Sequence, residues 1–151
     1  RAQELDSLFL SNLFRVQVDL TNIRSMLRLK LIESDRRDVF LEGGFVDRDR
    51  FWAGLDQAYD ALGALFMATP YQHILEAGAA YVASRQSFLK TEQLCEQYML
   101  GFLESTAQIT AGLQPVVAFL LRVEHEIRTV RLILTAKKNR LDAKLIQDRV
   151  A

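Results

Sequence analysis

The chain has 151 residues, half of them hydrophobic and a quarter charged, which suffices for one packed domain or two small repeats and argues against disorder. Nineteen basic residues balance nineteen acidic ones, so no net charge attracts nucleic acid or an anionic membrane surface. Cys95 is the single cysteine, which excludes an internal disulfide and fits a reduced, intracellular compartment. No apolar run approaches the roughly 18 residues that a membrane helix needs.

Apolar residues recur at helical spacing along the whole chain, and no alternating run typical of a strand is bounded by turn signals. The expected fold class is therefore all-α. In chain order, the predicted helices cover residues 3–10, 11–32, a stretch from 47 through 65, a stretch from 70 through 83, 86–109, 116–138, and a short last segment from 142 to about 150. A polar connection at 34–38 and a turn at Gly43-Gly44 separate the second helix from the third.

Local signals mark several of the predicted helix starts. Asp47 is placed to cap a helix with its carboxylate, and Val46 and Phe51 occupy the positions of a hydrophobic staple. Thr69-Pro70 predicts another start, with proline in the first turn. Leu141-Asp142 predicts a staple and cap for the last helix. No linker rich in proline, glycine or serine indicates a domain boundary.

An internal repeat is the most informative feature of the sequence. The segment that begins at Leu13 reads LFRVQVDLTNIRSMLRLK, and the segment that begins at Leu120, 107 residues later, reads LLRVEHEIRTVRLILTAK. On a helix, Val16, Leu20, Ile23 and Leu27 fall on one narrow seam, and the matching positions of the second copy are apolar too. Duplication of one structural unit explains this match, and the alternative is two amphipathic helices that look alike by chance.

Charges of fixed sign flank the apolar seam at the same places in both copies. We interpret them as structural ion pairs that tie helix to helix or repeat to repeat, and not as a substrate site. The eight residues of this charge constellation are Arg15, Asp19, Arg24, Lys30, Arg122, Glu126, Arg131 and Lys137.

The two copies, with the Gly43-Gly44 turn after the first, resemble the repeated helix signature of the C-subunit family of V-type (vacuolar and archaeal-type) ATPases, whose vacuolar members are known as d subunits. In that family a long helix carries an acidic residue, then Asn-Ile-Arg or a variant, then a lysine near its end. The resemblance is strongest over Leu13–Gly44 and Val116–Val150. At the second copy, Thr129-Val130-Arg131 departs from Asn-Ile-Arg, which weakens any specific role for the Asn22 amide.

The resemblance implies a fold and a function. The family is built of three similar helical units around a pseudo-threefold axis, and this chain resembles the last two. We therefore expect one helical domain made of two repeats, about 1–107 and 108–151. The implied function is that of a non-catalytic central-stalk component that links the proteolipid ring to the central stalk. It would lie peripherally on the cytoplasmic face of a membrane, and neither a cofactor nor a nucleic-acid partner is implied.

The residues themselves show no complete catalytic motif. Gly43-Gly44 lacks the ending of a phosphate loop, and no GxSxG, CxxC or HExxH occurs. Glu124-His125-Glu126 point in different directions on a helix and cannot all face one metal ion. Cys95 lies on an inferred apolar face, without a basic neighbour in sequence that would lower its pKa, and is interpreted as a buried structural cysteine.

Two carboxylate pairs at i,i+4 spacing leave an enzymatic alternative open. Asp56 with Asp60, and Glu92 with Glu96, are interpreted as solvated faces because no third ligand or histidine joins them at helical spacing. A second alternative is a helical regulatory module that binds an apolar ligand beside the small residues 77–83. The basic clusters at Arg36-Arg37 and 137–140 fit helix ends better than nucleic-acid binding.

Overall fold

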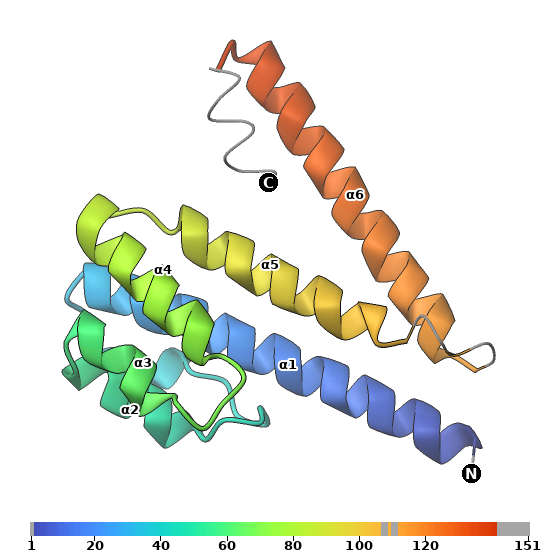
Figure 1. Ribbon diagram of the computed structural model, residues 1–151, viewed down its shortest axis with the longest axis horizontal. Helices are drawn as coiled ribbons and strands as arrows, with labels where there is room; N and C mark the ends of the chain where they lie inside the picture. Colours follow the sequence, from blue (N-terminus) through green and yellow to red (C-terminus); the bar gives the residue numbers. More distant parts are fainter. Residues whose placement is uncertain (1, 107–108, 110–111, 142–151) are drawn as a thin grey trace. The chain divides into compact units, whose positions relative to one another are not determined.

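The computed structural model describes residues 2–106, 109 and 112–141, and these form helices joined by short connections without a strand (Figure 1). The all-α prediction is confirmed. The α-helices are α1 (Ala2–Leu31), α2 (Arg48–Asp56), α3 (Leu62–Leu65), α4 (Gln72–Arg85), α5 (Leu89–Glu104) and α6 (Gln114–Lys138). The 3-10 helices are η1 (Arg37–Val39) and η2 (Tyr59–Ala61).

The chain divides into two compact units, and the helices α1 and α5 each contribute to both. Unit 2 comprises residues 11–96, and unit 1 comprises residues 1–10 together with 97–151. The repeat boundary expected near residue 107 stays a prediction about domain organisation.

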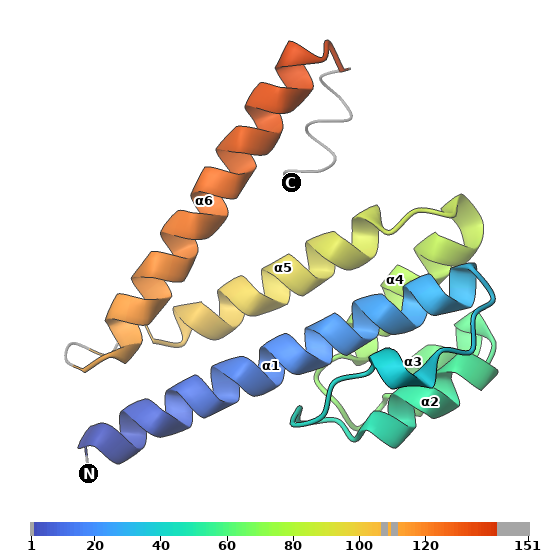
Figure 2. The same cartoon turned by 180° about the vertical axis from the view of Figure 1, so that it is seen from behind.

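Unit 2 is organised around the part of α1 that begins at Ser11. The seam predicted from the sequence is its buried face, with Val16, Leu20, Ile23 and Leu27 each at most 2% exposed. Helices α2, α3 and α4 gather beside this part of α1, and both views of the ribbon show α5 running alongside it (Figures 1 and 2). The apolar side chains of these helices complete the core, led by Phe51, Leu62, Phe66, Tyr71, Leu75 and Val82.

Two predicted helix boundaries in unit 2 are wrong. The helices predicted at 3–10 and 11–32 are one continuous helix, α1, which ends at Leu31, because neither glycine nor proline interrupts the chain near Ser11. The stripe from Phe51 to Leu65 is not one helix: α2 ends at Asp56, the chain is extended at Gln57, and η2 and α3 follow. Lys30 of α1 binds the carbonyls that α2 leaves free at this break.

The predicted start of α2 is correct in position but not in its cap. Asp47 occupies the N-cap position with extended backbone, yet its side chain makes no capping hydrogen bond. Val46 and Phe51, the predicted staple, are both buried. Both residues of the predicted staple are therefore in the core, while the carboxylate does not cap the helix.

The small residues of α4 allow close helix packing, as the sequence indicates. A Cβ at Gly78 would lie 2.7 Å from Oγ1 of Thr91 at the start of α5, and Ala79 is fully buried. Helix α4 begins at Gln72, two residues after Pro70, and ends at Arg85, and Gln86 follows it in the left-handed conformation. Gly78 and Ala79 thus pack against protein, while Ala80 and Ala83 are exposed.

In unit 1, Phe9 of α1 stacks on Phe102 of α5 with ring centroids 5.8 Å apart. Helix α6 begins at Gln114, earlier than the predicted Val116, because Pro115 is accommodated in the first turn, where its missing N–H costs no hydrogen bond. The predicted last helix, with its cap at Asp142, lies outside the described residues. None of the described helices has both the length and the apolar composition that a membrane span requires.

Candidate functional site

Asp19 is the centre of the first set of charged residues, and it is fully buried. Its carboxylate accepts hydrogen bonds from the backbone N–H of Phe45 (2.9 Å) and Val46 (3.2 Å), and from the hydroxyl of Tyr71 (3.0 Å). Burial raises the pKa of Asp19 above its ordinary value of 3.8, while these hydrogen bonds and the charge of Arg15 act in the opposite direction. The carboxylate therefore holds the turn before α2 and the start of α4 on α1.

The Gly43-Gly44 turn is shaped to bring its amides to Asp19. Gly43 has φ +93°, a conformation that side chains with a Cβ rarely adopt. A Cβ at Gly44 would overlap Oδ1 of Asp19 and would lie 3.3 Å from a methyl group of Val18. The absence of a side chain at Gly44 is what allows the turn to approach the helix.

Asn22 makes a second contact between α1 and the segment before α2. Its Nδ2 donates to the carbonyl oxygen of Leu41 (2.9 Å), and its Oδ1 accepts from the N–H of the same residue (2.8 Å). Asn22 is fully buried. Sequence reasoning gave Asn22 no specific role. Its position about one turn after Asp19 and beside the seam is the signal that could have indicated a buried contact.

Lys30 contacts backbone carbonyls where we expected an ion pair. Its Nζ donates to the carbonyl oxygens of Leu55 (3.0 Å) and Gln57, at the end of α2, and lies 5.1 Å from the ring centre of Tyr59. Desolvation lowers the pKa of Lys30, and the charge of Asp56 partly offsets this effect. Lys30 is thus a cationic cap for a neighbouring helix.

Arg24 forms an ion pair with Glu92 of α5. Its Nε lies 2.7 Å from Oε2, and the two side chains are 25% and 23% exposed. Arg28 binds the other oxygen of the same carboxylate at 2.8 Å. Interpreting Glu92 as part of a solvated face was therefore wrong: its partners are arginines on α1, which sequence spacing along α5 could not reveal.

Arg15 lies over the ring of Phe45, with its guanidinium carbon 5.4 Å from the ring centre. It covers the turn that Asp19 holds. All the contacts described for Arg15, Asp19, Arg24 and Lys30 are formed within unit 2. The structure brings them together as a row of anchors along α1, each with a different partner.

The second set lies on α6, in unit 1, and its environment differs. Arg122, Glu126, Arg131 and Lys137 are all exposed. Arg122 and Glu126 line a hollow of about 330 Å³, together with Thr106 and Phe119. The ion pair described on this helix joins neighbouring residues, Glu124 and Arg128, at 2.6 Å. That these residues tie repeat to repeat stays a prediction.

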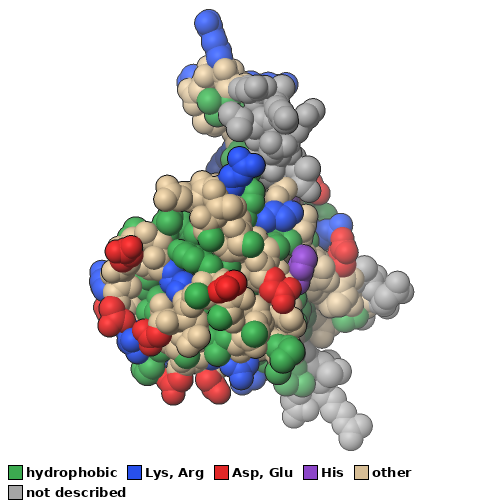
Figure 3. Space-filling model, turned by 60° about the vertical axis from the view of Figure 1, so that its left-hand side comes forward, with side chains coloured by type: hydrophobic (Ala, Val, Ile, Leu, Met, Phe, Trp, Pro, Cys, Tyr) green, Lys and Arg blue, Asp and Glu red, His purple; other side chains and the backbone are tan. Residues whose placement is uncertain are grey.

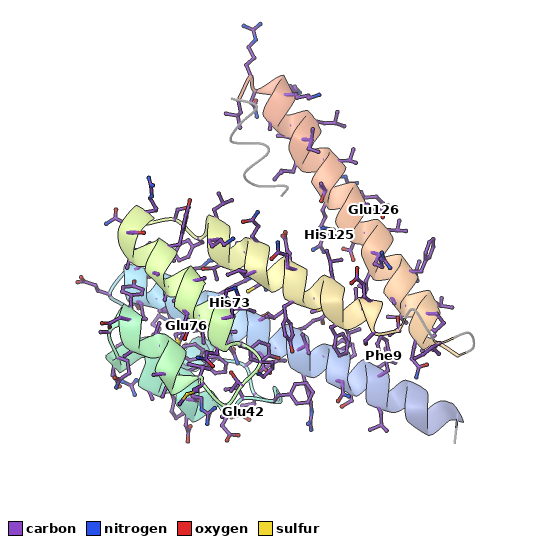
Figure 4. The ribbon with its side chains drawn as sticks, in the orientation of Figure 1. Phe9, Glu42, His73, Glu76, His125 and Glu126 are labelled. Carbon is purple, nitrogen blue, oxygen red and sulfur yellow. The ribbon has the colours of Figure 1, made fainter. Side chains whose placement is uncertain are left out.

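The remaining candidates for chemistry are dispersed. Figure 4 shows His73 on α4 and His125 on α6, so the two histidines belong to different units. Within the described residues, no three His, Cys, Asp or Glu side chains gather at metal-binding distance. Cys95 is fully buried, as expected, and burial raises the pKa of its thiol to about 12. On the face shown in Figure 3, acidic and basic side chains are interspersed.

Comparisons with known proteins agree on one family. The model of the family described as ATP synthase (C/AC39) subunit matches residues 1–149. The C subunit of the A-type ATP synthase of Haloferax volcanii is 24% identical over 134 residues, which cover 87% of this chain and 38% of that protein. The chain thus spans less than half the length of this curated relative. No solved structure matches the chain.

Proposed function

Because the chain belongs to the ATP synthase (C/AC39) subunit family, we propose that it is a non-catalytic coupling piece of a V-type rotary ATPase or ATP synthase. In this role it links a ring of proteolipid subunits to the central stalk on the cytoplasmic face of the membrane. Torque passes through it during ATP-driven or ATP-producing ion transport. The observation that carries the proposal is the family match, which extends over nearly the whole chain.

The anchors along α1 support a mechanical role. A coupling piece must transmit force without yielding, and its loops must therefore be fixed to its long helices. In unit 2 the segment between α1 and α2 is held at Asp19 and at Asn22, and the end of α2 is held at Lys30. These hydrogen bonds are at least partly shielded from water, which strengthens them and favours one arrangement of the segments.

The alternative of a module that binds an apolar ligand has less support. The small residues of α4 pack against Thr91, so they do not form a cavity wall at Gly78. Ala80 and Ala83 do line an open hollow of about 410 Å³, but Asp60 and Glu76 line it too. Covering two carboxylates with an apolar ligand would incur a desolvation penalty.

The decisive experiment compares ATP hydrolysis with ion transport in membranes that contain or lack the polypeptide carrying this chain. Without it, we expect hydrolysis by the catalytic head to persist while ATP-driven transport stops, and adding the polypeptide back should restore transport. Asp19→Ala should lower the transport obtained per ATP, because the turn and the start of α4 lose their anchor.

Arg128→Ala is the control, since the ion pair of Arg128 with Glu124 on α6 is exposed. A tagged polypeptide should also co-purify with the ring and central-stalk subunits. Transport per ATP that is unchanged in the absence of the polypeptide would exclude the proposed function.

A further inference from the structure

An open hollow of about 410 Å³ is lined by residues of α4 and η2, and we call it the α4 hollow. Helix α4 supplies Glu76, Ala80 and Ala83, whose spacing of four and three residues puts them on one stripe of the helix. The 3-10 helix η2 supplies Tyr59 and Asp60. All five residues belong to unit 2, so the hollow is formed within one compact unit.

The carboxylate of Glu76 is held in position beside this hollow. Figure 4 labels Glu76 on α4, where its Oε1 accepts a hydrogen bond of 2.9 Å from Nε2 of Gln72, one turn earlier. The stem of Glu76 lies against Gly63 of α3, because a Cβ added at Gly63 would overlap its Cγ. Gln72 is uncharged, so these contacts place the carboxylate without neutralising its charge.

The two carboxylates of the hollow have no cationic partner within the part of the chain that the structure describes. Glu76 is bonded to the neutral amide of Gln72, and Asp60 forms neither an ion pair nor a hydrogen bond there. Other aspartates of unit 2 are paired: Asp35, Asp38 and Asp56 each bind an arginine. Two uncompensated negative charges that line one hollow attract a cation.

The uncharged walls of the hollow favour a long side chain over a bare ion. Ala80 and Ala83 are exposed and offer methyl groups, and the ring of Tyr59 adds a further apolar surface. Burial raises the pKa of Tyr59 above its ordinary value of 10.0, so its hydroxyl stays protonated and uncharged at neutral pH. Hard metal ions need more oxygen ligands than two carboxylates supply.

Arginine and lysine match both parts of this lining. Their stems cover apolar surface while the charged head reaches polar groups at its edge. A guanidinium carries five N–H donors and can bind two carboxylates at once, and an ammonium carries three. Hydrogen bonds between such a head and a carboxylate are stronger than those between neutral groups.

We propose that the α4 hollow receives an arginine or lysine side chain from a neighbouring subunit of the rotary complex. The stem lies against Ala80 and Ala83, and the charged head binds the carboxylates of Asp60 and Glu76. This docking rests on the proposed function, which supplies the neighbouring subunit.

Photo-crosslinking tests the docking directly. The variant Ala83→p-benzoylphenylalanine, made in the polypeptide that carries this chain, is irradiated in the assembled membrane complex. Ala83 is exposed, so the larger side chain can be accommodated. We expect a cross-link to another subunit, which mass spectrometry should place within a few residues of an arginine or lysine.

Several results of this experiment would overturn the proposal. A cross-link to the same polypeptide, to a second copy of it or to lipid would do so, as would the absence of any cross-link. A cross-linked segment of another subunit that contains no basic residue would contradict the inferred chemistry.

Neutralising both carboxylates tests the charge complementarity. Asp60→Asn combined with Glu76→Gln should weaken binding of the polypeptide to a complex depleted of it by about tenfold or more. Asp49→Asn is the control, because Asp49 is an exposed carboxylate of α2 outside the hollow. Equal affinities of the double variant and the control would overturn the proposal.

The stability of the double variant separates a lost contact from a lost fold. Because the two carboxylates have no cationic partner among the described residues, the purified double variant should keep the midpoint of thermal unfolding or raise it slightly. A clear decrease in the midpoint would show that the carboxylates already serve the fold, and the proposal would then be wrong.

Filling the hollow tests its shape without changing its charge. Ala80→Leu should weaken binding several-fold, because the added side chain occupies the space of the basic stem. Ala64→Leu is the matched control at an exposed position of α3 outside the hollow, and it should bind like wild type. Equal binding by the two leucine variants would show that no side chain enters the hollow.

The proposed function and this docking fail in different ways. A polypeptide that does not co-purify with the ring and central-stalk subunits excludes both. A polypeptide that co-purifies and supports ATP-driven transport, but gives no cross-link from position 83, overturns the docking alone.

Discussion

The hydroxyl of Tyr71 donates a hydrogen bond of 3.0 Å to Oδ2 of Asp19, across 52 residues of sequence. Both residues are fully buried. Oδ2 also accepts the N–H of Phe45, so one oxygen joins the middle of α1 to the glycine turn and to the start of α4. The carboxylate of Asp19 therefore joins three segments of unit 2 at one point.

Replacing Asp19 by alanine should lower the free energy of unfolding by about 3 kcal/mol. The change removes the carboxylate that accepts hydrogen bonds from the hydroxyl of Tyr71 and from the backbone N–H groups of Phe45 and Val46. Urea denaturation followed by circular dichroism measures the loss, and Arg128→Ala provides a surface control with an expected loss of about 0–1 kcal/mol. A loss at Asp19 no larger than that of the control would show that the carboxylate is not an anchor.

Asp19 should also make the free energy of unfolding depend on pH, in the direction opposite to that of a carboxylate whose pKa is lowered by folding. Because burial raises its pKa in the folded state above the ordinary 3.8, the folded protein binds the proton more readily than the unfolded chain. The contribution of this group to stability is then full below pH about 4 and declines as the pH rises through the raised pKa.

The measurement is the difference in unfolding free energy between wild type and Asp19→Asn from pH 4 to pH 7. We expect the advantage of wild type to be largest at pH 4 and to shrink toward pH 7. An advantage that grows with pH would mean that the hydrogen bonds outweigh burial and lower the pKa.

The two turn glycines should respond differently to alanine. Gly43→Ala meets no atom within 4 Å but must adopt φ +93°, which costs about 1 kcal/mol. Gly44→Ala overlaps the carboxylate of Asp19 and should cost at least about 2 kcal/mol. A double-mutant cycle tests the cause: in the Asp19→Ala background, Gly44→Ala should be nearly neutral. Equal costs in both backgrounds would place the strain elsewhere.

Arg24 and Arg131 match in sequence but should differ in energy. Arg24→Ala leaves the half-buried Glu92 with Arg28 alone and should cost about 1–2 kcal/mol, of which lysine at position 24 recovers part. Arg131→Ala in residues 1–151 should change the unfolding free energy by less than about 0.5 kcal/mol, because Arg131 is exposed there. Thermal unfolding of Arg24→Ala and Arg131→Ala measures both losses of stability. Similar losses for the two variants would contradict the difference between a half-buried and an exposed arginine.

The sequence was sufficient to predict the all-α fold and the buried seam, though not every helix boundary, because periodicity along one helix is a local property. Leu20 and Ile23 were predicted to face the core, and they do so. The internal repeat also identified Asp19 and Lys30 as residues beside the seam. In both cases the signal lies within a few turns of one helix.

The partners of those charges could not be predicted, since they come from distant segments and are often backbone atoms. Lys30 binds carbonyl oxygens at a break after Asp56 that the apolar stripe concealed. Glu92 was interpreted as solvated because its partners, Arg28 and Arg24, lie 64 and 68 residues earlier in the sequence. Asn22 was understated because its partner, Leu41, offers only its backbone.

The contact between Gly44 and Asp19 also constrains how this protein can change over generations. A side chain at position 44 is costly while position 19 keeps its carboxylate, and a carboxylate at position 19 is best accommodated opposite glycine. A side chain at position 44 alone strains the contact, and loss of the carboxylate alone removes three hydrogen bonds. The two positions, 25 residues apart in the sequence, should therefore be inherited as a pair.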